Sequence, residues 1–478
     1  MLQRTLLAAA LAAFVMVPVG HAYVPVSSDL GPAKAYPSWP VLTAEMSALA
    51  SEFKDIARLH SAGVSSKGMD LWYMEIADFE NPDRIPLSAR EVVYIDGGTH
   101  ANEYIGVIFV MHVLRTLLRG YGSDETATWI VENRHTIILP LVNPDGSVNG
   151  VGRLNGNLVN INRNYPVGWG DVNELPVVNN PGPHPASESE TRAVMGVWER
   201  YDPDYVASIH CCGNLWLYPY GMEGRDPHPD DHAVFERICD EVLADVRDSC
   251  GPIWSTIYPA SGTTTDTGYE LFGANSWGFE MSGRERSGFV WGPPVYTTPI
   301  EELEKESWRA IFHAFLNVEK YGAHPVAEVA SVANGALTLV VRNDGWGNLS
   351  RGAIEVVDRA GMVRTARLPA LAAGDETRVT IQGSFGAGEF PVQLSYQKRP
   401  LDAKIGVTNL ALLVTSTASG LSASLASAAG GLPLSPASVS PESEGEPASA
   451  SVPGFEAFAA LAAVGVALLA ARRRRPGF

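Results

Sequence analysis

Basic side chains are scarce in this 478-residue sequence. Lys and Arg together number 35 against 53 Asp and Glu residues, which gives a formal net charge of −18. Binding to nucleic acid needs a basic patch, so we expect no nucleic acid as a partner. Cysteine is also rare, with four residues. In an extracellular chain they are compatible with disulfides. Cys211 and Cys212 are adjacent, closer than an unstrained bridge prefers, so the pairing among these two, Cys239 and Cys250 stays open.

The first 22 residues contain one early cation, Arg4. An apolar run over residues 6–19 follows, and then the small-residue segment 20–22. This order predicts a secretory signal peptide over residues 1–22. A membrane-spanning helix is the weaker alternative, because Pro18 and Gly20 interrupt the apolar run.

The C-terminal part lacks aromatic residues over 416–452, where Ser, Ala, Gly, Pro and Glu dominate. This composition predicts a disordered stalk. A Pro-Gly-Phe tripeptide at 453–455, an apolar stretch at 457–471 and four arginines at 472–475 then follow. The order resembles the tripartite sorting signal of archaeal surface proteins over residues 453–478. That resemblance implies cleavage and lipid attachment by a sorting transpeptidase, and an archaeal protein anchored at the cell surface through its C-terminus. An uncleaved C-terminal membrane helix is the alternative.

The chain is too long for one ordinary core, so at least two domains are expected. Over residues 36–321 helical and strand signals alternate, which predicts an α/β fold with a mixed sheet. The expected strands are 92–95, 136–142, 205–209 and 277–281, several of them apolar on both faces as in covered central strands. Expected helices cover 43–60 and 104–119, the latter ended by Gly120 as a left-handed cap. Another begins near Ser187, where Ser187-x-x-Glu190 has the form of a capping box.

After Pro325 the pattern changes to short strands separated by Gly, Asn and Asp turns. The expected strands are 337–341, 353–357, 376–381 and 392–396. They predict a small all-β sandwich over residues 325–414, similar in general texture to immunoglobulin-like modules.

Residues of the type that bind metals follow two of the expected α/β strands. Gly97 and Gly98 end one strand and let the chain turn sharply, so that His100 and Glu103 meet at the carboxyl edge of the sheet. His210 ends a second strand and supplies a third ligand, which is the number a catalytic zinc site needs. Glu280 lies among apolar residues, where burial would raise its pKa toward the range of a general base. A salt-bridged carboxylate is the alternative for Glu280.

An ordered set of motifs resembles the zinc carboxypeptidases of the carboxypeptidase A type over about residues 36–321. The motifs are Thr99-His100-Ala-Asn-Glu103, Asn143-Pro-Asp-Gly146, the segment 152–164, Ser208-Ile-His210, the segment 257–262 and Phe279-Glu280. The resemblance implies a twisted mixed sheet with flanking helices. It also implies a zinc-dependent enzyme that removes single residues from the C-termini of peptides or proteins.

Position by position, the resemblance assigns roles that make chemical sense. His100, Glu103 and His210 match the zinc ligands. Glu280 matches the general base, and Arg153 the cation that polarises the scissile carbonyl. Arg163 and Asn162 match the clamp on the terminal carboxylate, where a guanidinium forms two parallel hydrogen bonds. Tyr258 matches a mobile tyrosine that closes over the substrate.

The sequence also departs from the family's pattern. Asn160 stands where the family usually has an aspartate that hydrogen-bonds a zinc-ligating histidine, so zinc affinity is expected to be weaker. Asn102 replaces an arginine often found in the first motif. Thr265 matches the floor of the specificity pocket and Gly278 its wall. Without an acidic residue at the floor, apolar or aromatic C-terminal residues are favoured.

Two other functions remain open from the residues. One is a deacylase or amidase on the same scaffold, which the intact carboxylate clamp disfavours. The other is a non-catalytic surface-binding protein, which would have no need for Glu280 and three metal ligands together.

Overall fold

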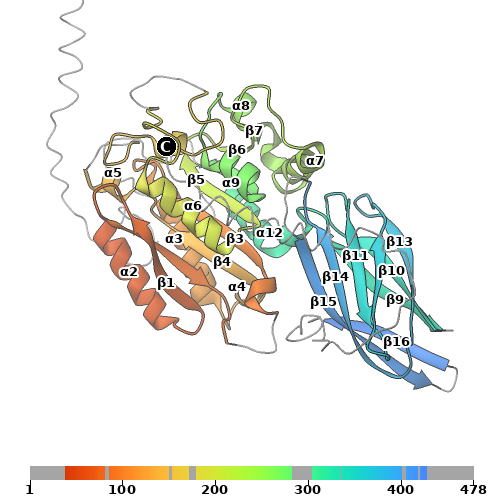
Figure 1. The fold of residues 1–478 in the computed structure, drawn as a ribbon. Helices are drawn as coiled ribbons and strands as arrows, with labels where there is room; N and C mark the ends of the chain where they lie inside the picture. The colour runs from red at the N-terminus through yellow and green to blue at the C-terminus, as the bar shows by residue number, and fades with distance from the viewer. Residues whose placement is uncertain are drawn as a thin grey trace, which may run out of the picture.

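The computed structural model describes residues 38–80, 85–149, 153–171, 179–281, 304–333, 335–400, 405–417 and 420–427. It comprises an α/β body followed by an all-β body at its side (Figure 1). The signal peptide, the stalk from residue 428 on and the C-terminal segment 453–478 lie outside the described residues. Within the described ranges no single helix has the length and apolarity to cross a membrane. Only the pair 104–120 and 125–133, bent by 97°, meets that test together by length and composition.

One eight-stranded mixed sheet forms the centre of the α/β body, with the order β1-β2-β4-β3-β5-β8-β6-β7. Its strands are β1 (Ala57–Val64), β2 (Asp70–Ile76), β3 (Glu91–Gly97), β4 (Arg134–Leu139), β5 (Tyr205–Cys211), β6 (Leu215–Tyr218), β7 (Cys250–Pro252) and β8 (Asn275–Met281). The central strands β4, β3, β5 and β8 are parallel to one another. The pairs β1–β2, β2–β4 and β8–β6 are antiparallel, and the edge pair β6–β7 is parallel. The mixed α/β sheet expected from the sequence is therefore confirmed.

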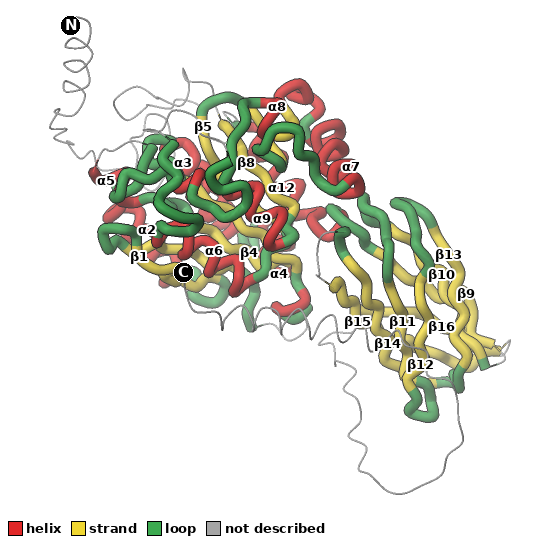
Figure 2. Tube along the Cα trace, turned by 45° about the horizontal axis from the view of Figure 1, so that its top comes forward, coloured by secondary structure: helices red, strands yellow, loops and turns green. Residues whose placement is uncertain are grey.

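Helices flank this sheet, as Figure 2 shows by colour. They are α2 (Trp39–Glu52), α3 (Tyr104–Gly120), α4 (Glu125–Asn133), α5 (Pro144–Asn149), α6 (Ser189–Tyr201), α7 (Pro229–Arg237), α8 (Ile253–Thr256), α9 (Thr264–Phe272) and α12 (Lys305–Asn317). Short helical turns occupy 87–89, 161–163, 238–242, 244–249 and 318–320.

The central strands are apolar on both faces because each face meets a separate hydrophobic cluster. In β3, Val93 and Ile95 join the cluster that contains α2, α3 and α12. Tyr94 joins the cluster on the other face, where Val197 and Trp198 of α6 pack. Side chains alternate between the faces of a strand, so a strand covered on both sides needs apolar residues at successive positions.

The all-β body consists of two antiparallel sheets around one core. Three strands have the order β13-β10-β9 and five have the order β12-β11-β14-β15-β16. The strands are β9 (Pro325–Ala333), β10 (Ala336–Asn343), β11 (Gly352–Val357), β12 (Val363–Leu368), β13 (Glu376–Gln382), β14 (Gly388–Gln397), β15 (Ile405–Thr417) and β16 (Gly420–Ser427). Leu339 of one sheet and Leu394 of the other belong to the same buried cluster. The immunoglobulin-like classification stays a prediction.

The predicted boundary between this domain and the stalk is wrong. Strand pairing continues beyond residue 414, since β15 extends to Thr417 and β16 pairs with it antiparallel. Residues 416–417 and 420–427, predicted as disordered stalk, are therefore part of the sheet. Ser and Ala are weak strand formers by composition, but a backbone ladder with β15 satisfies their N–H and C=O groups whatever their side chains are.

Three local predictions about helices are also wrong. The first helix ends at Glu52 rather than His60, because residues from Ala57 on pair with β2 as strand β1. Gly120 is not a left-handed cap: it ends α3 at a close contact, where a Cβ would lie 2.6 Å from Cβ of Ala127. The residue that precedes α6 is Glu188, and its side chain forms no capping hydrogen bond. The capping box predicted at Ser187 is therefore not formed.

Candidate metal centre and substrate pocket

The turn after β3 brings the first two candidate metal ligands out at the carboxyl edge of the sheet. Gly98 adopts a φ of +65°, and a Cβ there would lie 2.7 Å from Cδ1 of Leu141. Only glycine accepts both that conformation and that approach. The chain then reaches His100, and Glu103 directly precedes α3. The sharp glycine turn predicted from the sequence is therefore confirmed.

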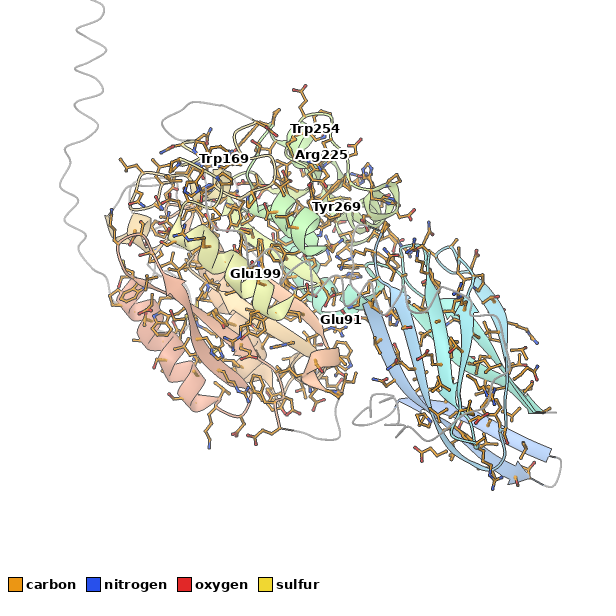
Figure 3. All side chains as sticks on the ribbon, in the orientation of Figure 1. Glu91, Trp169, Glu199, Arg225, Trp254 and Tyr269 are labelled. Carbon is orange, nitrogen blue, oxygen red and sulfur yellow. A yellow bond between two sulfur atoms is a disulfide. The ribbon has the colours of Figure 1, made fainter. Side chains whose placement is uncertain are left out.

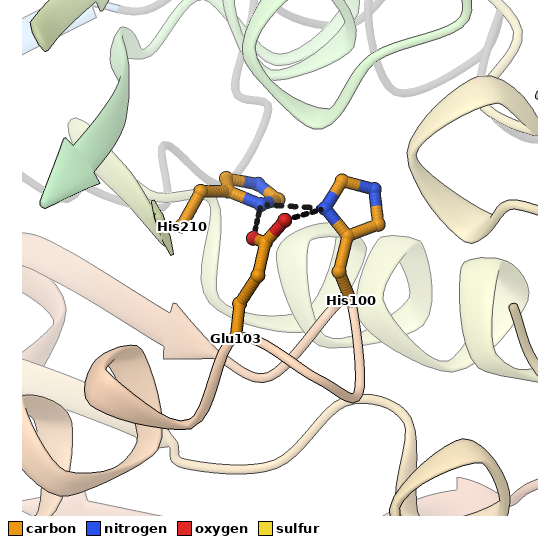
Figure 4. Close-up of side chains that lie close together, drawn as sticks. All are labelled: His100, Glu103 and His210. Carbon is orange, nitrogen blue, oxygen red and sulfur yellow. Dashed lines mark hydrogen bonds and ion pairs between the residues drawn. The ribbon is translucent and has the colours of Figure 1, made fainter. Parts of the chain in front are cut away.

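His100, Glu103 and His210 converge at one buried point (Figure 4). The Nδ1 atom of His100 lies 2.8 Å from Oε1 of Glu103, and Nδ1 of His210 lies 2.9 Å from Oε2 of the same carboxylate. The two Nδ1 atoms are 3.2 Å apart. The atoms with which the three residues could bind a metal all lie within 4.8 Å of one another. Two imidazoles and one carboxylate converging in this way fit a zinc ion that keeps a fourth position for water or substrate.

The electrostatics of His100 and Glu103 also suit a metal. Burial and the nearby Arg153 lower the pKa of His100 to about 3, which keeps this imidazole neutral. Burial alone would raise the pKa of Glu103, but His100 and His210 hold it below its usual value, so that the carboxylate is ionised. A neutral imidazole and an ionised carboxylate are the forms that bind a cation.

Each imidazole is also held from its outer nitrogen. Nε2 of His100 lies 3.1 Å from Oδ1 of Asn160. Nε2 of His210 lies 3.1 Å from the hydroxyl oxygen of Ser208. Such contacts fix the ring orientation of metal-binding histidines. Asn160 thus occupies the position that the sequence comparison assigned to it and accepts the hydrogen bond that was expected of a neutral amide.

Glu280 lies next to the ligands because β8 pairs with β5, where Glu280 and His210 are register partners. Burial and the Glu103 carboxylate raise the pKa of Glu280 to about 7. A general base works best with a pKa near the operating pH. Among the described residues Glu280 forms no recorded salt bridge, so the structure does not favour the alternative of a salt-bridged structural carboxylate.

The same pocket contains the predicted substrate-binding residues. It is open to solvent and is lined by His100, Arg153, Asn162, Arg163, His210, Leu217, Ile253, Ile257, Tyr258, Ala260, Thr263, Thr265, Gly278 and Glu280. Nine of the ten predicted site residues are in this lining, and the tenth, Glu103, is the buried ligand behind them. The structure brings all ten together; their individual roles stay predictions.

Contacts within the pocket orient the clamp residues. Oδ1 of Asn162 accepts hydrogen bonds of 2.9 Å from both the backbone N–H and the hydroxyl of Thr264. The NH₂ group of Asn162 is thereby left as the group that can donate elsewhere. Arg163 donates to the Asn162 carbonyl oxygen at 2.8 Å, and its guanidinium carbon lies 6.0 Å from the ring centre of Tyr258. Nη1 of Arg153 lies 3.1 Å from Oε1 of Glu103.

Sequence reasoning missed several residues of this site. Thr264 was not identified, although the Thr263-x-x-Asp266 spacing marks the start of α9, where the Thr263 hydroxyl accepts the Asp266 N–H. Leu217 and Ile253 line the pocket without any local signal.

The structure also pairs the four cysteines, whose pairing the sequence left open. Cys211 is bonded to Cys212 and Cys239 to Cys250. Strand β5 ends at Cys211, so Cys212 does not continue the face that carries His210. The Cys212 sulfur is engaged with its neighbour, which removes it as a thiolate ligand for metal.

Comparison with known proteins agrees with this geometry. The zinc carboxypeptidase family model matches residues 42–310, more than half of the chain. Human mast cell carboxypeptidase A is 26% identical over 280 residues, covering 53% of this chain and 65% of that protein. Human carboxypeptidase D is 31% identical over 202 residues, covering 40% of this chain but 14% of that protein. The chain thus spans less than two thirds of the length of these relatives.

A solved structure shows the same fold. Carboxypeptidase A from Helicoverpa armigera superposes with a TM-score of 0.51 at 23% identity, covering 66% of this chain and 80% of that one. Thrombin-activatable fibrinolysis inhibitor also gives a TM-score of 0.51, at 20% identity and with coverage of 59% and 74%. With the family model covering the whole segment that carries the ligands, the chain belongs to the zinc carboxypeptidase family.

Proposed function

We propose that this protein is a zinc-dependent exopeptidase that hydrolyses the C-terminal peptide bond of peptides or proteins. One observation carries the proposal. The His100–Glu103–His210 cluster, the raised-pKa carboxylate of Glu280 and the guanidinium of Arg163 all face one pocket. The metal-binding cluster and Glu280 fit hydrolysis of a peptide bond, and Arg163 fits recognition of a free carboxylate.

His100, Glu103 and His210 would hold the zinc ion, which when bound supplies Lewis acidity toward water and the scissile carbonyl. Glu280 accepts a proton from the attacking water and delivers it to the leaving amine. Arg153 donates to the carbonyl oxygen as negative charge develops there. Arg163 and Asn162 bind the terminal carboxylate, which sets the distance from the chain end to the bond that is cut.

The walls of the pocket favour apolar or aromatic C-terminal residues. Leu217, Ile253, Ile257 and Ala260 contribute apolar surface, and Gly278 leaves space. Thr265, at the predicted floor, is neutral. Among the described lining residues the charged groups are Arg153, Arg163 and Glu280, all assigned to the reaction or the clamp. A C-terminal Lys or Arg would therefore lack a dedicated partner and lose hydration without compensation.

The test is zinc content together with release of free amino acids from N-blocked dipeptides. A carboxypeptidase binds one zinc per chain and releases Phe from a blocked dipeptide with a free C-terminus, but not from its C-terminal amide. Equal cleavage of both would favour the amidase alternative. Absence of cleavage with zinc bound would favour a binding protein. Release of Arg faster than Phe would overturn the proposed preference.

We also propose that the enzyme acts outside the cell, anchored through its C-terminus. The residue pattern supports this: a signal peptide at 1–22, and the tripeptide, apolar stretch and arginines of 453–478. Deletion of residues 453–478 should move the protein from the membrane fraction to the medium. Mutation of the Pro453-Gly454-Phe455 tripeptide alone distinguishes a cleaved, lipid-attached C-terminus from an uncleaved membrane helix. Only cleavage by a sorting transpeptidase depends on the tripeptide, so an uncleaved helix would be unaffected by the mutation.

A further inference from the structure

A buried carboxylate lies behind one of the two histidine ligands, in a place that the sequence did not reveal. Asp96 is the penultimate residue of β3 and is completely buried. Its Oδ1 accepts a 2.7 Å hydrogen bond from the hydroxyl of Ser208, which is itself completely buried. The same hydroxyl oxygen lies 3.1 Å from Nε2 of His210. Asp96, Ser208 and His210 therefore form one continuous chain of hydrogen bonds.

The sheet itself fixes this chain of contacts. Asp96 and Ser208 are register partners in the parallel pair β3–β5. Ser208 and His210 are two residues apart on β5, so their side chains lie on the same face. The contacts thus depend on backbone positions at the centre of the sheet, where the strands are fully buried.

The proton positions follow from which groups can accept. When Nδ1 of His210 faces the metal, Nε2 carries the proton and must donate. The Ser208 oxygen can accept this proton while its own O–H donates to Asp96. The NH₂ group of Asn162 lies 3.4 Å from the same Nε2, but an amide nitrogen is a donor and cannot accept. The hydroxyl is therefore the partner of His210.

Asp96 needs a source of positive charge. A buried ionised carboxylate is costly unless it is paired. Within the described ranges no lysine, arginine or histidine forms a recorded salt bridge with Asp96, although the Tyr94 hydroxyl interacts with it. A divalent ion with one carboxylate ligand, Glu103, keeps a net positive charge. That charge would stabilise the ionised form of a buried carboxylate that is connected to the site through Ser208.

The two histidines are supported differently. Behind His100 stands the neutral amide of Asn160, and behind His210 stands a hydroxyl backed by a carboxylate. We propose that Asp96, acting through Ser208, is the positioning carboxylate of the metal site, which orients His210 and strengthens zinc binding from that side. This inference rests on the proposed zinc-dependent function.

The test measures zinc affinity in the full chain by competition with a chelator, independently of catalysis. Asp96→Asn keeps the shape but removes the charge, and Ser208→Ala removes the connecting hydroxyl. Each should weaken zinc binding about 10- to 100-fold, the range typical for loss of such outer contacts. Ser276→Ala, a buried serine on β8 without a recorded contact to the ligands, is the matched control and should change zinc affinity by less than about twofold.

The double variant decides whether Asp96 acts through Ser208. In a relay, Asp96→Asn adds little once Ser208 is Ala, so the two losses do not multiply. Melting curves of the metal-free proteins show whether each variant is folded, and the visible spectrum of the cobalt-substituted protein should shift in both variants but not in Ser276→Ala.

Three outcomes would overturn the inference. Wild-type affinity in both single variants would remove the role of this carboxylate, and losses that multiply in the double variant would remove the relay. In either case the proposed function survives if the wild type binds zinc. A wild-type protein that binds no zinc would overturn both proposals.

Discussion

Nζ of Lys398 in the all-β body lies 2.6 Å from Oε2 of Glu91, the first residue of β3, and 2.9 Å from Oδ1 of Asp204, the residue before β5. In Figure 3 Glu91 lies where the α/β body faces the all-β body, far from the end that carries Trp254. The neighbouring Arg399 donates to the carbonyl oxygens of Gly273 and Asp204. The second domain therefore contacts the amino ends of the strands whose carboxyl ends carry the candidate metal ligands.

Lys398→Met should destabilise the whole chain. It leaves the carboxylates of Glu91 and Asp204 side by side without their cation. Loss of one member of a partly buried ion pair costs on the order of 2 kcal/mol, between the values for exposed and fully buried pairs. Urea unfolding at pH 8 measures this loss. Lys305→Met, which removes an exposed partner of Glu306, is the control and should change the free energy of unfolding by less than about 0.5 kcal/mol. Equal stability of both variants would show that the contact is incidental.

The loss from Lys398→Met should also depend on pH. Burial and the nearby Asp204 already raise the pKa of Glu91 to about 7, above its value in an unfolded chain. A carboxyl group whose pKa is higher in the folded state favours folding at low pH and loses that contribution as the pH rises through about 7. The variant should therefore be closer to the wild type in stability at pH 5 than at pH 8. The opposite order would contradict the assigned charges.

Glu280→Gln should reduce kcat by about 10²- to 10⁴-fold while zinc binding is retained, because proton transfer is lost but the ligands remain. The exposed Glu199→Gln on α6 is the control. In the wild type, activity should fall as the pH drops through the pKa of Glu280, which is about 7 in the metal-free protein. A bound cation lowers that pKa, so the midpoint of the fall should lie at or below pH 7. Full activity of Glu280→Gln would exclude a catalytic role.

Arg163→Lys should raise KM about tenfold or more for peptides with a free C-terminus. Lysine keeps the charge but cannot form two parallel hydrogen bonds with a carboxylate. Arg192→Lys, whose guanidinium is exposed and contacts the carbonyl oxygens of Ala186 and Ser187, should leave KM unchanged. Steady-state kinetics with a blocked dipeptide provides the measurement. An unaltered KM in Arg163→Lys would show that another residue binds the terminal carboxylate.

Gly278→Val should narrow the specificity pocket. Among the described residues, a Cβ at Gly278 would meet the Thr265 hydroxyl oxygen at 3.1 Å, so a small shift of the Thr265 side chain is needed to admit a side chain there. The added volume should lower kcat/KM for a C-terminal Phe by tenfold or more and affect a C-terminal Ala much less. Parallel loss for both substrates would indicate general damage to the site instead of a change of its shape.

Asn160→Asp should tighten zinc binding. The substitution places a carboxylate behind Nε2 of His100, which makes the imidazole a stronger ligand. Nδ2 of Asn160 now donates to Oδ1 of Asn179, a contact that Asn179 can replace by rotating its amide. Chelator competition against the wild type gives the comparison. An unchanged affinity would show that the neutral amide already satisfies His100.

The candidate metal ligands could be predicted from the sequence because each one is marked locally. The glycines at 97 and 98 and the apolar strands before His100 and His210 are visible as short patterns, and parallel strands present their carboxyl ends at one edge. Asp96 and Ser208 stand in those same strands, but their hydrogen bond joins residues 112 positions apart (208 minus 96). Only the register of β3 against β5 brings them together.

The strands of the second domain could also be predicted only in part from the sequence. Its four strands with strong alternation were recognised, whereas β9, β12, β15 and β16 were not. The Ser- and Ala-rich segment 420–427 is a strand because the backbone of β15 lies beside it, and no property of its own side chains requires this. The contact of Lys398 with Glu91 likewise joins residues that carry no mutual signal.

By itself, the sequence determined which strands are buried and which side chains can bind a metal, because hydrophobic alternation and short ligand motifs act over a few residues. The tertiary structure decided the extent of the second domain, the pairing of the cysteines, the apolar wall of the pocket and the carboxylate behind His210. Each of these depends on which distant segments pack together, and that choice is made by the free energy of the whole fold.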